Sequence, residues 1–478
     1  MRVLSSIVDP VPLHRPPLDE AFMPAFLWRR AYQAAASRER GTSPVSLALV
    51  QPEGTVSVFR TVILPDTAEH AAANYLYLER TLKFLLWSRG GSRVFIAGAP
   101  SSAGRLATTY SPAGRRSFDA EFLGSRIYLD RFAVTPCHDS DLPQENESGV
   151  VGGGGLDGCR IGFDLGGSDR KVAAVIDGEV VFSEETPWDP YFQSDPAYHE
   201  HGIRESLRCA AAHLPRVDAI GGSAAGVYVG NEPRAGSLYR GLPEDVFAAR
   251  IRPLFKRLAA EWGVPVEVAN DGDVTALAAS RLPGRGTVSG GVLGLSLGTS
   301  LAAGYVGPDG RLRPWLNELA FIPVDYREAS EGAHVDEWSG DAGTGVRYHS
   351  QQALGQLLAD RPEILTGLPL PEKLAVLQEA AERGEVWTQP VYESLGVYLG
   401  YSLAHFAEFY DFDRVLLLGR VTTGRGGEFM MSKAAMVLRD ESPELSKQVS
   451  FVAVDENFKR HGQAIAAASL PRIKSTAR

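Results

Sequence analysis

Two glycine-rich hairpins, which lie more than a hundred residues apart, place the strongest constraint on the fold of this chain. In residues 159–185 (CRIGFDLGGSDRKVAAVIDGEVVFSEE), two apolar strands flank a Gly-Gly turn, and an Asp-Gly turn follows. In residues 290–314 (GGVLGLSLGTSLAAGYVGPDGRLRP), two apolar strands flank a Gly-Thr-Ser turn, and an Asp-Gly turn again follows. The repetition predicts two duplicated halves that face each other across a cleft.

The first hairpin carries residues that suit a phosphate group. Gly166 and Gly167 would let the backbone approach a phosphate closely, and Ser168 adds a hydroxyl. Asp164, at the end of the strand, could hold a metal-bound water. A Gly-Gly hairpin is, however, more often only a turn, so this segment alone is weak evidence for a site.

Two further segments complete the pattern. Residues 413–436 place Gly419 between an apolar strand and a helix pattern, a turn that can admit a nucleotide. Residues 266–280 (VEVANDGDVTALAAS) pass from a strand through Asn270 and Asp271 into a helix of small residues. Both are favoured helix-capping residues, and this segment alone favours that role. A carboxylate above a strand-to-helix turn is also where α/β enzymes place a catalytic base.

Composition excludes several classes of protein. With 478 residues, of which 44% are hydrophobic, the chain is long enough for two or three domains. Its net charge of −10 disfavours a nucleic-acid partner. The 3 cysteines are scattered, which fits neither a disulfide framework nor a Cys-x-x-Cys metal site and predicts a reducing cytoplasm. We find neither a signal peptide nor an apolar run of about 18 residues, so we expect no membrane partner.

The first 150 residues form a region of their own. Residues 145–158 (ENESGVVGGGGLDG) have the composition of a linker. Before the linker, the sequence predicts a hairpin around Pro52–Gly54, a helix over Asp66–Trp87 and then a short strand. Residues 1–150 are therefore expected to be an α+β region, whose role the sequence does not indicate. After the linker, residues 187–206 are expected to form an aromatic loop.

Taken together, the motifs resemble the actin-like ATPase fold of sugar kinases, actin and Hsp70, and within it the ROK family of sugar kinases and related repressors. FDLGGSDRKVAAVIDGEVV resembles the first phosphate motif of the family, although SDRK makes its turn longer than the usual Gly-Gly-Thr-Lys. VPVEVANDGDVTALAAS resembles the Asn-Asp segment, LSLGTSLAAGYVGPDGRL the second phosphate motif, and RVLLLGRVTTG the adenosine motif. The resemblance covers about residues 157–470.

The resemblance implies a two-lobed actin-like ATPase (ribonuclease H-like) α/β fold with duplicated lobes, plus the additional N-terminal α+β region. Lobe I would span residues 157–285 and include a C-terminal helix at about 458–472. Lobe II would span residues 286–457.

The resemblance also implies an ATP-dependent sugar kinase that uses Mg²⁺. Asp271 would be the general base that takes a proton from the attacking sugar hydroxyl. Asn270 and Glu318 would bind sugar hydroxyls, and Asp164 would hold Mg²⁺ through water. The residues implied to bind ATP are Gly166, Gly167, Ser168, Gly298, Thr299 and Gly419.

One segment departs from the family, in which a histidine and three cysteines hold a structural zinc. Phe321 stands at the histidine position, although the Gly340–Gly343 frame is kept. The cysteine positions hold Glu337, Ser339 and Thr344. Zinc prefers Cys and His ligands at such sites, so we expect no zinc here. The loop would then be held by packing or by another domain, for which the N-terminal region is the candidate. We interpret His334 and His349 as ordinary surface or loop histidines.

Two other functions remain open. A non-catalytic ROK-like sugar-sensing regulator or pseudokinase would bind sugar without turnover, but the retention of Asp271 favours a kinase. A DNA-binding repressor is disfavoured because residues 1–150 show no basic helix pair, and an Hsp70-type ATPase because too few residues follow 440. The expected partner is a small-molecule sugar. The sequence leaves open which sugar it is, which hydroxyl would react, and whether the protein forms a homodimer.

Overall fold

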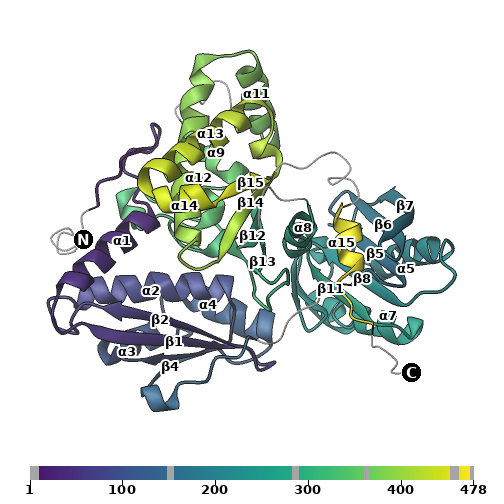
Figure 1. Cartoon of the computed structure of the whole chain (residues 1–478), viewed down its shortest axis with the longest axis horizontal. Coiled ribbons are helices and arrows are strands. Elements are labelled where there is room, and N and C mark those ends of the chain that lie inside the picture. Colours follow the sequence, from purple (N-terminus) through teal and green to yellow (C-terminus); the bar gives the residue numbers. More distant parts are fainter. Residues whose placement is uncertain are drawn as a thin grey trace.

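The computed structural model describes residues 10–147, 155–282, 290–359, 361, 367–452 and 462–473. Three larger sheets, each with its own helices, form three bodies around a common junction (Figure 1). Half of the predicted linker, residues 148–154, lies outside the described residues. Among the described helices, none is both long and apolar enough to cross a bilayer.

The N-terminal region is a four-stranded sheet covered by helices. Its strands, in the order β2-β1-β3-β4, are β1 (Ser43–Val50), β2 (Val56–Ile63), β3 (Arg93–Ala97) and β4 (Ala133–Cys137). Its helices are α1 (Ala25–Arg38), α2 (Ala71–Ser88), α3 (Pro100–Thr109), α4 (Ser117–Glu121) and the π-helical turn η1 (Phe122–Tyr128). The antiparallel β1–β2 hairpin confirms the predicted one. Helix α2 begins later than predicted, because residues 67–70 first form a turn in which the His70 N–H donates to the Thr67 carbonyl.

Lobe I contains a five-stranded sheet in the order β11-β8-β5-β6-β7. The strands are β5 (Cys159–Leu165), β6 (Asp169–Ile176), β7 (Glu179–Pro187), β8 (Ala219–Ala224) and β11 (Val266–Asn270), and a separate ribbon pairs β9 (Val227–Val229) with β10 (Glu232–Ala235). The helices are α5 (Pro196–Ala211), α6 (Glu244–Val246), α7 (Leu254–Trp262) and α8 (Asp271–Ser280). The expected loop over 187–206 is wrong in its second half. Helix α5 begins there because Pro196 suits a first helical position and the Asp195 carboxylate caps the Ala197 N–H at 2.9 Å.

Lobe II repeats part of this plan in a four-stranded sheet ordered β13-β12-β14-β15. Its strands are β12 (Gly291–Leu297), β13 (Leu301–Val306), β14 (Phe412–Leu418) and β15 (Ser450–Val452). Its helices are α9 (Leu354–Leu357), α11 (Leu370–Glu382), α12 (Gln389–Phe406), α13 (Gly424–Glu441) and α14 (Pro443–Gln448). In each lobe an antiparallel hairpin is followed by two parallel neighbours, so the expected duplication and fold class are confirmed.

The two lobes exchange helices across their junction. Helix α8 follows the last strand of the lobe I sheet but packs against β12 and β13 of lobe II. Helix α15 (Gln463–Ala468) comes after β15 of lobe II but packs against β5 and β8 of lobe I (Figure 1). The exchange places the first turn of α8, and Asp271 with it, between the two lobes.

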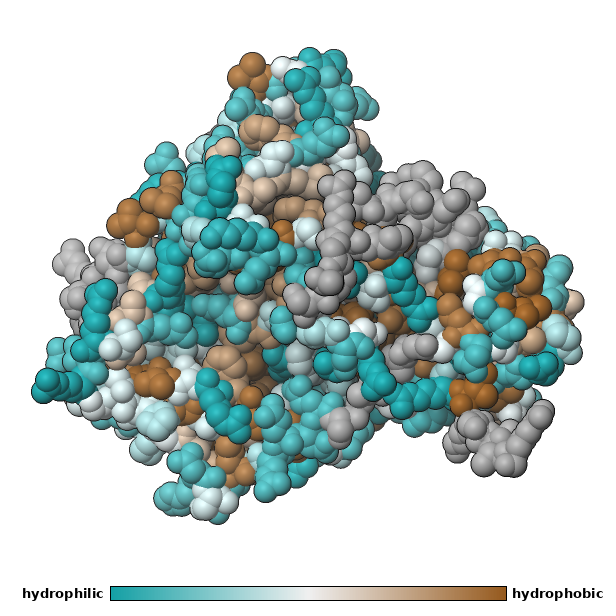
Figure 2. Space-filling view, in the orientation of Figure 1, coloured by the Kyte–Doolittle hydropathy of each residue, from teal (hydrophilic) through white to brown (hydrophobic). Residues whose placement is uncertain are grey.

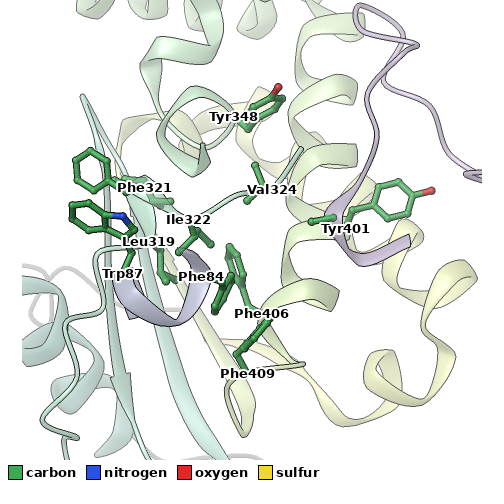
Figure 3. Close-up of a cluster of buried hydrophobic side chains, with 14 of the residues drawn as sticks. Phe84, Trp87, Leu319, Phe321, Ile322, Val324, Tyr348, Tyr401, Phe406 and Phe409 are labelled. Atoms are coloured by element: carbon green, nitrogen blue, oxygen red, sulfur yellow. The ribbon is translucent and has the colours of Figure 1, made fainter. Parts of the chain in front are cut away.

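The N-terminal region shares one hydrophobic core with lobe II. Trp87 from α2 lies against Phe321, and Phe84 stacks on Phe409 with ring centroids 3.8 Å apart (Figure 3). Most side chains of α2 are buried, because the sheet of its own region covers one side and lobe II the other. By contrast, the face of the molecule shown in Figure 2 is largely hydrophilic over these two bodies, with apolar side chains in scattered patches.

Candidate active site

At the junction of β11 and α8, Asn270 and Asp271 have different roles, which the sequence alone did not distinguish. The side-chain oxygen of Asn270 accepts the Gly272 N–H at 2.7 Å and caps α8, while its amide donates to the Gly226 carbonyl at 2.7 Å. The Asp271 carboxylate also accepts the Gly272 N–H, at 3.0 Å. Asn270 is thus the geometric cap, and Asp271 is a half-buried carboxylate in the first turn of the helix.

Glycines bring this turn against lobe II. A Cβ atom at Gly272 would lie 2.3 Å from the Ala303 carbonyl, and one at Gly304 would lie 2.1 Å from the Gly272 carbonyl. The backbones of α8 and β13 therefore touch, which only glycine allows. A cavity of about 70 Å³ at this contact is lined by Asp271 and by Ser296 and Leu418 of the lobe II sheet.

Four carboxyl groups gather at the junction, of which Asp164 and Asp273 are buried and Asp271 and Glu318 half-buried. Burial raises the pKa of Asp271, that of Asp164 to about 6, and those of Asp273 and Glu318 to about 7. The negative charge of Asp271 contributes to the upward shift of the other three. Such mutual repulsion shows that the groups lie close enough to interact and that a cation or a hydrogen-bonding ligand would stabilise their charged forms.

Asp164 sits at the end of β5, where the Ser223 hydroxyl of neighbouring β8 donates to it at 2.6 Å. The predicted phosphate residues Gly166, Gly167 and Ser168 form the turn between β5 and β6. This turn packs against the following segment. The Trp188 indole donates to the Gly166 carbonyl at 2.8 Å, and Tyr191 occupies the space that a Cβ atom of Gly167 would need.

The corresponding turn of lobe II holds Gly298 and Thr299 between β12 and β13, and Thr299 is exposed. Gly419, after β14, has φ +96°, and a Cβ atom there would lie 2.3 Å from the carbonyl of Leu297. Glycine at 419 therefore permits the start of the predicted adenosine motif to approach the end of β12. The structure brings these two nucleotide-side predictions together.

A cavity of about 1110 Å³ is lined by all three bodies. Glu318 and Phe321 come from lobe II, and Gly226 and Tyr239 from lobe I. The N-terminal region contributes Trp87, Phe118, Glu121, Phe122, Ser125 and Arg126. Asn270 instead lines a separate cavity of about 450 Å³ together with Asp273 and Trp315. The two predicted substrate-binding residues, Asn270 and Glu318, therefore line different cavities.

Helix α2 holds the backbone at Glu318 in place. The Asn317 N–H donates to the Ser88 carbonyl at 3.0 Å, and the Glu318 N–H donates to the Trp87 carbonyl at 2.8 Å. Asn317 has the left-handed conformation, with φ 53°. Its amide donates to Asp273 at 2.8 Å and thereby links residues 317–350, which we call the acceptor loop after the role predicted for Glu318, to α8.

The loop that resembles the zinc segment is held by buried ion pairs. Asp341 pairs with Lys83 of α2 at 2.9 Å and with Arg116. Lys83 also pairs with Asp119 at 3.0 Å, and all four side chains are buried. Burial alone would raise the pKa of Asp341, but the charges of Lys83, Arg116 and Arg80 lower it well below its ordinary value. Within the described part of the chain, no group of three or more His, Cys, Asp or Glu residues could hold a metal ion.

Both histidines lie in loops, as interpreted, but only His334 reaches the surface. His349 is buried, and its ring nitrogen bonds the Ser402 hydroxyl at 2.7 Å. Burial lowers its pKa to about 3, so the ring is neutral. His334 is half-buried beside Asp19, and burial lowers its pKa to about 4. Both are packing residues of the acceptor loop.

No family model and no curated protein matches the sequence. Solved structures do match the fold. A ROK hexokinase from Thermus thermophilus is 19% identical over 65% of this chain and 97% of its own, with a TM-score of 0.51. The fold is that of the ROK family. A ROK family transcriptional regulator, a homologue of the E. coli MLC protein, is 21% identical over 66% of this chain and 79% of its own, with a TM-score of 0.52. The ROK fold is therefore shared here with both an enzyme and a regulator.

Sequence analysis missed several residues of the site. Asp273 lies in the same Asn-Asp-Gly-Asp segment as Asp271, and its burial could have been suspected from the apolar residues around it. Ser223 faces Asp164 only through the register of two strands. Nothing in the sequence indicated that α2, α4 and η1 of the N-terminal region line the large cavity.

Proposed function

We propose that this protein is an ATP-dependent kinase of a sugar hydroxyl, with Asp271 as the general base. The proposal rests on the position of Asp271, a half-buried carboxylate in the first turn of α8 that lies between two lobes of the ROK fold and interacts electrostatically with Glu318. A base with a raised pKa is better matched to proton transfer near neutral pH.

The acceptor sugar would bind at the end of the large cavity where Glu318 lies. Glu318, held through its backbone by α2, would accept hydrogen bonds from the sugar hydroxyls. Asp271 would take the proton of the attacking hydroxyl as its oxygen bonds to the γ-phosphorus and ADP leaves. Asn270 would act mainly by fixing the start of α8, since both ends of its amide already bond to the backbone.

ATP would bind between the two glycine turns. Gly166, Gly167 and Ser168 from lobe I, and Gly298 and Thr299 from lobe II, would line its phosphates, with Gly419 beside the nucleoside. Asp164 fits a Mg²⁺ ion, because burial raises the pKa of its carboxyl group and a bound cation would lower that pKa again. When bound, Mg²⁺ would neutralise charge on the phosphates. Lobe closure would exclude water and limit hydrolysis of ATP.

A second candidate is a regulator that binds sugar without turnover. The likeness to a ROK family transcriptional regulator supports it, since the fold accommodates that role. Against it stands the carboxyl group of Asp271, which a purely binding protein would not need and whose raised pKa means that its charged form is disfavoured without a ligand.

The test is a coupled ADP-release assay with ATP and Mg²⁺ over hexoses, amino sugars and N-acetylated sugars. We expect turnover that depends on one class of sugar and stops when EDTA removes Mg²⁺. Absence of turnover with every sugar, combined with a sugar-induced rise of the melting temperature, would favour the regulator.

A further inference from the structure

The large cavity extends beyond Glu318 along an aromatic wall. Trp87 lies 4.2 Å from Phe321 between ring centroids, and Phe321 lies 5.3 Å from Trp338. Trp338 also makes edge contacts with Phe118 and Phe122 of the N-terminal region, at 5.8 and 5.2 Å. These rings line the same cavity as Glu318. The wall therefore runs from the proposed acceptor position outward.

Trp338 is the unusual member of this wall. It belongs to the acceptor loop, two residues after Asp336 and three before Asp341, both of which are buried. Trp338 itself is 61% exposed, although three aromatic rings hold it from behind. Ordered support and an open ring face are what a stacking platform requires, since a rigid aromatic gives contact area with little loss of conformational entropy.

The opposite wall is polar and comes from lobe I. Arg240, Glu244 and Arg252 line it, together with Ser237 and Tyr239. Glu244 pairs with Arg252 and with Arg126 of the N-terminal region, both at 3.2 Å, so the polar groups are fixed by one another. A sugar ring matches this combination, because its C–H face is apolar and its hydroxyl edge forms hydrogen bonds. At about 1110 Å³ the cavity exceeds the upper end of the range typical of drug-sized ligands, whereas one hexose ring is smaller than these.

We infer that the acceptor is a glycoside of at least two sugar rings, one placed at Glu318 and the next stacked on Trp338. The inference rests on the proposed function for the identity of the first ring. It adds a specificity site made by the acceptor loop and the N-terminal region together. A free hexose would fill only the inner part of the cavity.

Titration calorimetry without ATP tests the inference independently of turnover. The probes are glucose, maltose, cellobiose and sucrose, with phenyl glucoside as an apolar comparison. We expect at least one disaccharide to bind about tenfold more tightly than glucose, and Trp338→Ala to remove that advantage while glucose binding is unchanged. Trp338→Phe should restore part of it. Phe429→Ala, an exposed aromatic on α13 outside the cavity, is the matched control and should change neither affinity.

Each outcome decides between the two proposals. Disaccharide binding that depends on Trp338, without any ADP release, would support the two-ring site and contradict the kinase. Phosphorylation of glucose with no preference for a disaccharide would support the kinase and overturn the two-ring site. Tighter binding of phenyl glucoside than of any disaccharide would also overturn it, because the platform would then select an apolar group.

Discussion

The nucleotide side and the acceptor side of the cleft are built in different ways. The turns proposed to bind ATP are short, local and glycine-dependent, as Gly419 beside Leu297 shows. The acceptor side depends on contacts between segments far apart in the chain, such as Lys83 with Asp341 and the α2 carbonyls with Glu318. Short glycine turns can therefore be specified locally, whereas the acceptor loop depends for its support on a second region of the chain.

The largest effect is expected at the junction of the two sides. Asp271→Asn should lower kcat by about 10²–10⁴-fold, because the amide cannot take the hydroxyl proton. Stability should stay the same or rise, since a charge that its surroundings disfavour is removed. Rates and melting temperatures measure the two effects. Asp273→Asn is the matched control and should cost far less activity, because its amide oxygen can still accept the Tyr305 N–H. Equal losses in both variants would contradict the role of Asp271.

The next effect tests the support of the acceptor loop. Lys83→Met removes one of the two buried cations that pair with both Asp119 and Asp341, the other being Arg116, and should lower the free energy of unfolding by about 3–5 kcal/mol. Chemical denaturation measures the change. Arg115→Met, which breaks the exposed pair with Glu328, should cost about 0–1 kcal/mol. Similar values for both variants would show that the buried network is not a support.

The pH dependence of kcat/KM should reflect the ionisation of carboxyl groups in the candidate active site. Because burial raises the pKa of Glu318 to about 7 and that of Asp164 to about 6, kcat/KM should fall as the pH drops below about 7. Glu318→Gln should raise KM for the sugar and move this acidic limb to lower pH, since the amide does not titrate and a carboxyl group with a pKa of about 7 is removed. An unmoved limb would exclude Glu318 as the titrating group.

The same carboxyl groups have the opposite effect on stability: their contribution to the free energy of unfolding falls as the pH rises. Groups whose pKa is raised in the folded state stabilise it below their unfolded pKa, and this contribution is lost as the pH rises through the folded value. These carboxyl groups should therefore lower the melting temperature of the unliganded protein at pH 8 relative to pH 5.5, whereas His334 and His349, whose pKa values are lowered by burial, act in the opposite direction. Glu318→Gln isolates the carboxyl contribution, because its melting temperature should fall less, or rise more, between pH 5.5 and pH 8 than that of the wild type. Asp341 does not oppose this trend in that range, because its pKa is lowered. Scanning calorimetry at both pH values provides the check.

The smallest effect is expected on the nucleotide side. Thr299→Ala removes one exposed hydroxyl from the lobe II turn and should raise KM for ATP a few-fold with little change in kcat or in sugar affinity. Ser300→Ala, the neighbouring exposed residue, should be silent. A loss of sugar affinity in Thr299→Ala would contradict the separation of the nucleotide side from the acceptor side.

The sequence predicted the elements that are specified by residues close together in the chain. The β5–β6 and β12–β13 hairpins follow from alternating apolar residues around glycine turns, and their pairing is as expected. The sequence did not predict α5 correctly, because prolines and aromatics in 187–206 masked a capped helix start. The pairing of Lys83 with Asp341 joins residues more than 250 positions apart, and no local pattern encodes such a contact. The roles of the site residues and the domain boundaries stay predictions.

The central claim is that the N-terminal region supports sugar binding but not nucleotide binding. The most direct test measures both affinities by calorimetry in Asp341→Asn, beside the wild type, after thermal denaturation shows that the variant is folded. The account predicts that affinity for a non-hydrolysable ATP analogue with Mg²⁺ is unchanged while sugar affinity falls at least about tenfold. Equal loss of both affinities, or loss of nucleotide affinity alone, would contradict it.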